Sequence, residues 1–301
     1  MTILELQKLL NLPETGDWTE FDEAAWKNHS LKTGLDYKPL PITKEEIPVE
    51  VPEMEIDESH GLISTDLSEA IKPKINQYNL KSGQYFKGPT KKEYLFLHFT
   101  AGWENPYRVV DDWNSDTRGA IGTQFVIGGR NCQTLEDKYD GEIVQCMKTE
   151  NYAWHLGVGN SALHRNSIGI EICNFGPLNR VLNDYYSWAN KRVNSSEIVD
   201  LKKDFRGKRY FHKITNEQLH SLNFLIGKIS KETGIDCTKG LKERLKKVDP
   251  FKAFDYDPVI QSGNLKGLFC HTNVSGLNKY GGYDKTDWWP CPELIDLINS
   301  L

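Results

Sequence analysis

The sequence contains no apolar run near the roughly 18–20 residues that a membrane-spanning helix needs. Its first residues, MTILELQKLLNLPETG, also lack the basic start and the uninterrupted apolar stretch of a secretion signal. From these two absences we expect no membrane insertion, and we expect synthesis in a cytoplasm.

Cysteine is sparse and poorly spaced for a structural role. Six cysteines are spread through 301 residues without a CxxC pair. This pattern excludes a disulfide scaffold and a cysteine-rich zinc module. We expect mostly free, partly buried thiols.

Strong charge of one sign is missing as well. The net charge of −5 is uneven, because residues 1–60 carry five basic and fourteen acidic side chains and the remainder carries +4. That excess is too small to indicate a nucleic-acid partner. The 38% hydrophobic and 26% charged content is typical of a globular protein.

The chain is predicted to have two domains joined by a linker. Residues 1–38 show apolar residues at helical spacing and predict a small helical unit. Residues 39–60 contain four prolines and seven acids, which favours an extended linker. Residues 61–301 form the larger domain, in which 177–213 is an insertion. We expect this insertion to be a solvated flap, with a glycan-gripping or nucleic-acid-gripping surface as the alternative.

Alternating strands and helices within 61–301 predict an α/β domain with a mixed central sheet flanked by helices. The best-supported helix runs over 216–232, because Thr215 and Gln218 form a capping box and Gly234 ends it. The other expected elements are strands at 93–99, 123–128, 142–146, 167–173 and 266–271, and helices at 105–115 and after Pro292.

Four apolar runs end on reactive side chains. They are LFLHFTAG with His98, YAWHLGVGN with His155, NSIGIEICNFG with Glu171 and GLFCHTNVSG with His271. Strand ends of an open α/β sheet form the crevice in which ligands bind, so these side chains can meet in one place. Glu171 projects from the strand face opposite a row of isoleucines, where a carboxylate must be paired, solvated or used.

Two imidazoles from different strands are suited to a zinc ion, which then needs a third ligand. The carboxylates after His271 are Asp284, Asp287 and Glu293. If Asp287 is the ligand, Lys285 faces the same way two residues earlier. Its ammonium could then stabilise the negative charge that grows on a carbonyl oxygen during acyl transfer.

These motifs, in this order and followed by Lys-Thr-Asp, resemble the zinc-dependent type 2 N-acetylmuramoyl-L-alanine amidases, over about residues 90–295. The family also includes amidase-type phage lysozymes and animal peptidoglycan-recognition proteins. The resemblance implies that His98, His271 and Asp287 bind Zn²⁺ and that Glu171 is the general base. It further implies that Lys285 stabilises the oxyanion. The side chains expected to contact substrate are His155, Thr123 and Trp103.

The implied function is hydrolysis of the amide bond between N-acetylmuramic acid and L-alanine in bacterial peptidoglycan. The segment LQKLLNLPETGDWTEFDEAAWKNHSLKTGL resembles a peptidoglycan-binding three-helix repeat, although a plain helical cap has the same periodicity. We therefore expect a monomeric phage endolysin that waits in the host cytoplasm. The alternatives are a cytoplasmic recycling amidase, a peptidase and a non-catalytic peptidoglycan-recognition module.

Overall fold

The computed structural model describes residues 72–277, 282 and 287–301. The expected helical unit at 1–38, the linker at 39–60 and Lys285 lie outside the described residues. One compact unit comprises Ile71–Arg180 and Asp184–Leu301. No helix in the described ranges is both long enough and apolar enough to cross a bilayer.

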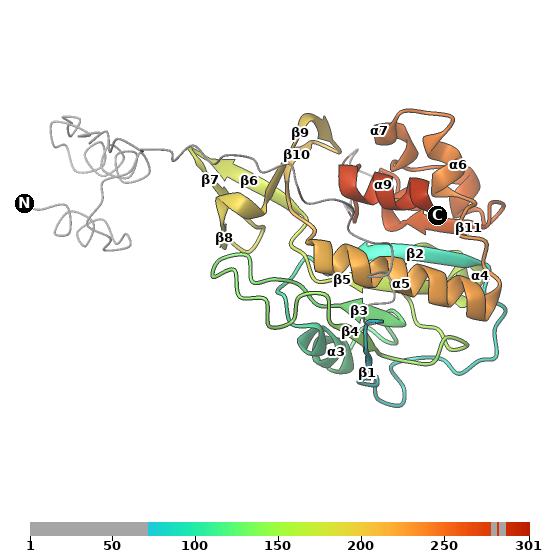
Figure 1. Ribbon diagram of the computed structural model, residues 1–301. Coiled ribbons are helices and arrows are strands. Elements are labelled where there is room, and N and C mark those ends of the chain that lie inside the picture. The colour runs from blue at the N-terminus through green and yellow to red at the C-terminus, as the bar shows by residue number, and fades with distance from the viewer. Residues whose placement is uncertain (1–71, 278–281, 283–286) are drawn as a thin grey trace, which may run out of the picture. The chain divides into compact units, whose positions relative to one another are not determined.

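A six-stranded mixed sheet forms the centre of this unit (Figure 1). Its strand order is β1-β4-β3-β5-β2-β11, in which β11, β2, β5 and β3 are parallel and β4 is antiparallel to β3. The strands span Ile75–Gln77 (β1), Tyr94–Phe99 (β2), Phe125–Ile127 (β3), Ile143–Gln145 (β4), Ser167–Ile172 (β5) and Gly267–Cys270 (β11). The predicted mixed α/β class is confirmed.

Helices cover both faces of the sheet (Figure 1). The main core lies between one face and the helices α5 and α9, with residues of α6 and α7 at its margin. On the other face, α3, α4 and α8 pack over smaller apolar clusters. The helices span Pro106–Asn114 (α3), Ser161–Arg165 (α4), Asn216–Thr233 (α5), Leu241–Leu245 (α6), Pro250–Ala253 (α7), Pro258–Gln261 (α8) and Pro292–Ser300 (α9).

The longest described helix, α5, begins and ends where its sequence predicts. The Thr215 hydroxyl accepts from the Gln218 amide, and the Gln218 side chain accepts from the Thr215 amide. Gly234 ends the helix in the left-handed conformation, with φ of 75°. Its buried side chains, among them Leu222 and Ile229, face the sheet.

The insertion at 177–213 differs from the expected flap. It forms a five-stranded sheet in which β10 pairs antiparallel with β6 and β9, and β7 pairs antiparallel with β8. Leu178 and Val193 are buried against Cys132 and Phe175, because alternate side chains of these strands turn inward. The strands span Pro177–Val181 (β6), Asp184–Tyr186 (β7), Arg192–Val193 (β8), Ile198–Phe205 (β9) and Lys208–His212 (β10), with a 3₁₀ turn at Ser195–Glu197.

The second sheet is anchored to the loop that follows β5. The Phe175 amide donates to Nδ1 of His212 at 3.2 Å, and the Asn174 side chain donates to the carbonyl oxygens of His212 and Lys213. Burial lowers the pKa of His212 to about 4, so its ring is neutral and its Nδ1 can accept.

All six cysteines lie in the described part of the chain. Each is a free, buried thiol, which confirms that they are unpaired and shows deeper burial than we expected.

Candidate metal centre and active site

Strand alternation in β2 decides from which face of the sheet His98 projects. Leu95 and Leu97 enter the main core on one face, so Phe96 and His98 point to the other. His98 pairs in register with Glu171 on the neighbouring strand β5. Residues paired in this way project from the same face, so the imidazole and the carboxylate lie side by side.

His271 and Asp287 converge on His98 from distant parts of the chain. His271 follows β11 directly, in the 3₁₀ turn His271–Asn273, and its Nδ1 lies 3.0 Å from Nδ1 of His98. Oδ2 of Asp287, in the segment before α9, lies 2.8 Å from Nδ1 of His271 and 3.7 Å from Nδ1 of His98. The three side chains thus present one ligand atom each to a common point.

The cluster is largely shielded from solvent. The side chains of His98 and His271 are 1% and 3% exposed, whereas that of Asp287 is 16% exposed. Burial alone would raise the pKa of Asp287, but the imidazoles of His271 and His98 outweigh burial and hold that pKa low. Asp287 therefore presents an ionised carboxylate.

The donor set fits a zinc ion. Nε2 of His271 lies 2.8 Å from the Leu156 carbonyl oxygen, which can only accept, so Nε2 donates to it and Nδ1 is the nitrogen left to face a metal. Tetrahedral zinc ligands at about 2.0–2.1 Å from the ion lie about 3.3–3.4 Å apart. The three observed separations of 2.8, 3.0 and 3.7 Å surround that value.

Glu171 is held beside this cluster by a close-packed strand. Its negative charge adds to burial in raising the pKa of the Cys173 and Cys146 thiols, which lie on the same side of the sheet. At Gly169 a Cβ atom would stand 2.5 Å from Thr123 Cγ2 and 3.1 Å from His155 Nδ1. The glycine of the SIGIE motif is thus required for close packing under the site.

His155 lies behind His98. Its Nδ1 is 3.0 Å from Nε2 of His98, and its Nε2 is 2.7 Å from the Ser167 hydroxyl. Burial, with the neighbouring His98 adding to it, lowers the pKa of His155 well below that of an ordinary histidine, so the ring is neutral.

The profile of the N-acetylmuramoyl-L-alanine amidase family matches residues 88–250, more than half of the chain. The chain belongs to this family. No curated protein matches the sequence.

Three of the solved structures similar to this amidase-family chain show how distant such relatives are in sequence. A mutant endolysin from Bacillus subtilis is 19% identical, with 60% of this chain and 98% of that chain covered and a TM-score of 0.34. A selenomethionine derivative of AmpD is 14% identical, with coverage of 74% and 93% and a TM-score of 0.37. The amidase AmiD from E. coli, solved with its substrate, is 18% identical, with coverage of 49% and 46% and a TM-score of 0.31.

The structure treats the two other expected substrate contacts differently. Thr123 is fully buried and donates its hydroxyl to the Phe125 carbonyl oxygen at 3.0 Å. Trp103 lines a cavity of about 420 Å³, and Thr100, two residues beyond His98 in the sequence, belongs to the same lining.

Trp188 is a candidate substrate contact that the sequence did not single out. It lines the same cavity as Trp103, is 67% exposed and donates from Nε1 to the Ala101 carbonyl oxygen at 2.6 Å. The signal was its place in an insertion rich in aromatic and basic residues. Trp288 and Trp289, by contrast, are buried packing residues.

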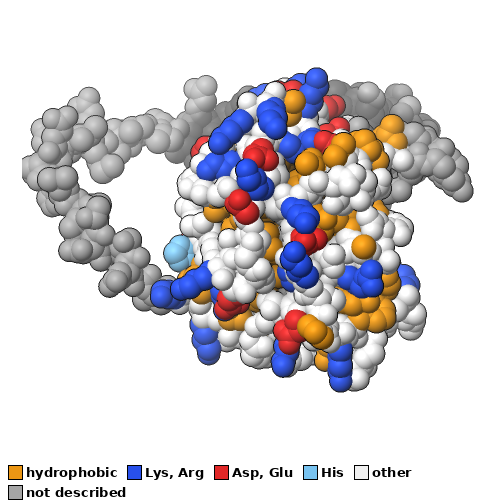
Figure 2. Space-filling view, turned by 90° about the vertical axis from the view of Figure 1, so that its right-hand side faces the viewer, with side chains coloured by type: hydrophobic (Ala, Val, Ile, Leu, Met, Phe, Trp, Pro, Cys, Tyr) orange, Lys and Arg blue, Asp and Glu red, His pale blue; other side chains and the backbone are white. Residues whose placement is uncertain are grey.

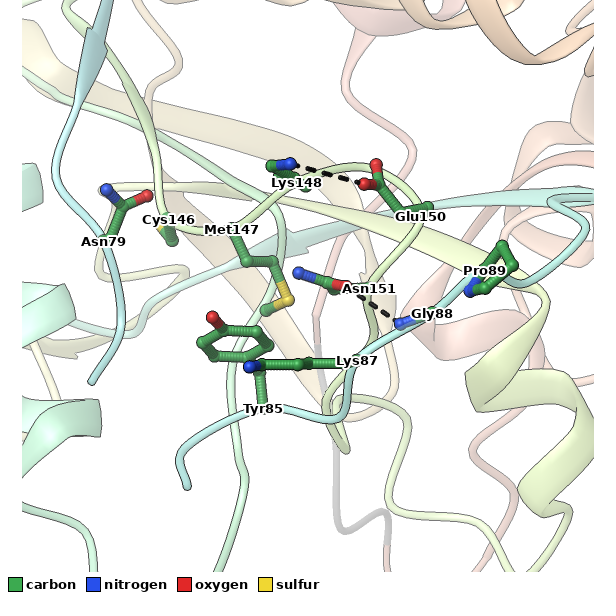
Figure 3. A pocket seen from close by; sticks show the side chains of 10 residues that line it. All are labelled: Asn79, Tyr85, Lys87, Gly88, Pro89, Cys146, Met147, Lys148, Glu150 and Asn151. Atoms are coloured by element: carbon green, nitrogen blue, oxygen red, sulfur yellow. Dashed lines mark hydrogen bonds and ion pairs between the residues drawn. The ribbon is translucent and has the colours of Figure 1, made fainter. Parts of the chain in front are cut away.

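A larger cavity, of about 600 Å³, has none of the candidate metal ligands in its lining (Figure 3). It is lined by residues after the carboxyl ends of β1 and β4, which run opposite to β2 and β5. Lys148 pairs with Glu150 there, and the Gly88 amide donates to the Asn151 side chain. The cavity thus lies at the opposite end of the sheet's strands from His98.

The distribution of charged side chains on the face shown in Figure 2 does not indicate a binding partner of one charge. Lys and Arg side chains are scattered there among acidic and apolar ones, without one continuous basic patch among the described residues. This distribution matches the small charge excess of the sequence.

Proposed function

We propose that this protein is a zinc-dependent amidase that hydrolyses the bond between N-acetylmuramic acid and L-alanine in bacterial peptidoglycan. The observation that carries the proposal is the convergence of His98, His271 and Asp287 on one point, with Nδ1 of His271 directed there. Membership of the amidase family supports the choice of bond.

His98, His271 and Asp287 would hold the metal, because their ligand atoms lie within 4.8 Å of one another. Asp284, the other nearby carboxylate of the sequence, lies outside the described residues. When bound, zinc would supply a Lewis acid that lowers the pKa of a water molecule towards about 7 and polarises a carbonyl group. Two imidazoles and one carboxylate leave a coordination position for that water.

Glu171 is the proposed general base. It projects from the same sheet face as His98, one strand away. Its carboxylate would take a proton from the attacking water as the water oxygen bonds to the carbonyl carbon. The same carboxyl group would return that proton to the departing L-alanine nitrogen as the carbon–nitrogen bond breaks.

Lys285 is the proposed donor to the oxyanion. It lies two residues before Asp287 in the sequence, outside the described residues. Replacing such a donor typically lowers the rate by about 10²–10³. We expect Lys285→Ala to retain fold and zinc binding while turnover falls by about this factor.

The cavity that Trp103 and Trp188 line is the proposed substrate groove, because its lining includes Thr100, two residues beyond His98 in the sequence. Exposed indole rings provide broad apolar faces with a polar edge, which suits a glycan bearing a short peptide. We further propose that residues 1–38 direct the enzyme to the cell wall and that the protein acts as a phage endolysin.

Digestion of purified peptidoglycan tests the proposed activity. We expect new L-alanine amino termini and intact glycan strands, loss of release under a chelator, and recovery with added zinc. Binding to the wall without release would support the recognition module instead. Release of any other amino terminus would support a peptidase. Glu171→Gln provides the control for contaminating hydrolases.

A further inference from the structure

The candidate ligand His98 and two side chains behind it form one continuous hydrogen-bonded row. Nε2 of His98 lies 3.0 Å from Nδ1 of His155, and Nε2 of His155 lies 2.7 Å from the Ser167 hydroxyl. The Ser167 hydroxyl in turn lies 3.1 Å from the His164 carbonyl oxygen. The row leads from the interior of the protein to Nε2 of His98. The other ring nitrogen of His98, Nδ1, faces Asp287.

The direction of donation in this row follows from its inner end. The His164 carbonyl oxygen can only accept, so the Ser167 hydroxyl donates to it and accepts from Nε2–H of His155. Nδ1 of His155 then carries a lone pair, which accepts from Nε2–H of His98. Nδ1 of His98 is consequently the unprotonated nitrogen that faces His271 and Asp287.

Reversing the row would have the opposite result. If the Ser167 hydroxyl donated to His155, each proton would shift by one position and Nδ1 of His98 would carry a proton. That proton would point at Nδ1 of His271, 3.0 Å away, and would occupy the place of a cation. The orientation of one serine hydroxyl therefore distinguishes a metal-competent cluster from a blocked one.

We propose that His155 and Ser167 are positioning residues that fix the tautomer of His98 and so set the zinc affinity of the site. This inference rests on the proposed function and assigns His155 a role towards the ligand His98, where the sequence suggested a contact with substrate. Its neighbours fix it in place: the His155 amide donates to Nδ1 of His164, whose Nε2 donates to the Val158 carbonyl oxygen.

Zinc dissociation constants of the full-length protein, measured by competition with a chromogenic chelator, test the proposal. Removing a partner that orients a metal-ligating histidine typically weakens binding about 10–100-fold. We expect this loss in His155→Phe, which keeps a ring but no acceptor, and in Ser167→Ala. His155→Gln keeps an acceptor oxygen for His98 and should recover part of the affinity. His220→Phe, at an exposed position of α5, is the matched control and should bind like the unmodified protein.

Two further measurements separate positioning from substrate contact and from loss of fold. Circular dichroism should show every variant folded, and Ser167→Ala, the smallest change, is the decisive one if His155→Phe unfolds. At saturating zinc we expect KM on a soluble muropeptide to stay within about twofold. A raised KM with unchanged zinc affinity would overturn the proposal in favour of substrate contact. Unchanged zinc affinity in Ser167→Ala and His155→Phe would also overturn it.

Nitrogen-15 spectra of the histidine rings provide an independent readout. In the zinc-loaded protein we expect His98 to be protonated at Nε2. This Nε2 proton should show a scalar coupling across the hydrogen bond to Nδ1 of His155. Protonation of Nδ1 of His155 would show the reversed row and refute the inference. If the unmodified protein fails to bind zinc at all, the proposed function fails, which is a different outcome from equal binding by all variants.

Discussion

His98 and Glu171 are directly paired across β2 and β5, so a candidate metal ligand and a candidate proton carrier share one sheet face. The spacing of adjacent parallel strands fixes the separation of these two residues, which therefore does not depend on the conformation of a loop. The rest of the centre is added around this pair: His271 by the adjacent strand β11, and Asp287 by the segment leading into α9.

Glu171→Gln is expected to lower amidase turnover by about 10²–10⁴, because the amide cannot take a proton from water. Zinc affinity should change little, since Glu171 is not among the three converging ligand residues. Steady-state rates on muropeptide together with chelator competition check both expectations. Turnover within tenfold of the unmodified enzyme would remove Glu171 from its proposed role.

Gly169→Ala is expected to destabilise the fold by about 1–3 kcal/mol through overpacking. Its new methyl group would stand 2.5 Å from Thr123 Cγ2, inside the buried layer under the site. Adding Thr123→Ser removes the Cγ2 methyl of residue 123 and keeps its hydroxyl, so the double variant should regain part of the lost stability. Urea unfolding measures both. Gly227→Ala is the control, because a Cβ there meets nothing within 4 Å and alanine favours the helix α5. Equal stability of both alanine variants would contradict the packing argument.

Trp188→Ala is expected to raise KM for glycan-bearing substrate several-fold and to leave kcat nearly unchanged. The indole is 67% exposed beside the cavity, so its loss removes binding surface without opening the core. Kinetics on a muropeptide and on a glycan-free peptide amide should show the effect on the muropeptide alone. Leu265→Ala, at another exposed apolar position, serves as the comparison. An unchanged KM would place the glycan elsewhere.

His212 should make stability depend on pH. Its pKa is about 4 when folded, against 6.5 in the unfolded chain, so only the unfolded chain binds this proton between those values. The free energy of unfolding therefore rises with pH from about 4 to 6.5, by about 3 kcal/mol for this group, and is level above. His212→Asn keeps an acceptor for the Phe175 amide and should flatten this part of the profile. Urea titrations across pH 4–8 measure the difference; parallel profiles for both proteins would refute it.

The sequence predicted the elements that depend on local signals. The capping box at Thr215, the glycine at 234 and the buried strand that carries His98 are each specified by neighbours within a few residues, and the structure has all three. The insertion at 177–213 was mistaken for a flap because its strands are short and pair mainly with one another. Pairing of that kind leaves only a weak periodic signal in the sequence.

By itself, the sequence determined the class of fold and the set of reactive residues, because strand alternation and motif order are written into consecutive positions. Only the tertiary structure decided that imidazoles 173 residues apart lie 3.0 Å from one another, since strand register brings them together. It also decided which nitrogen of His271 faces the cluster, because the other nitrogen contacts the carbonyl oxygen of Leu156 on a distant segment. The burial of Thr123 and the exposure of Trp188 were likewise set by packing between elements, which no local pattern specifies.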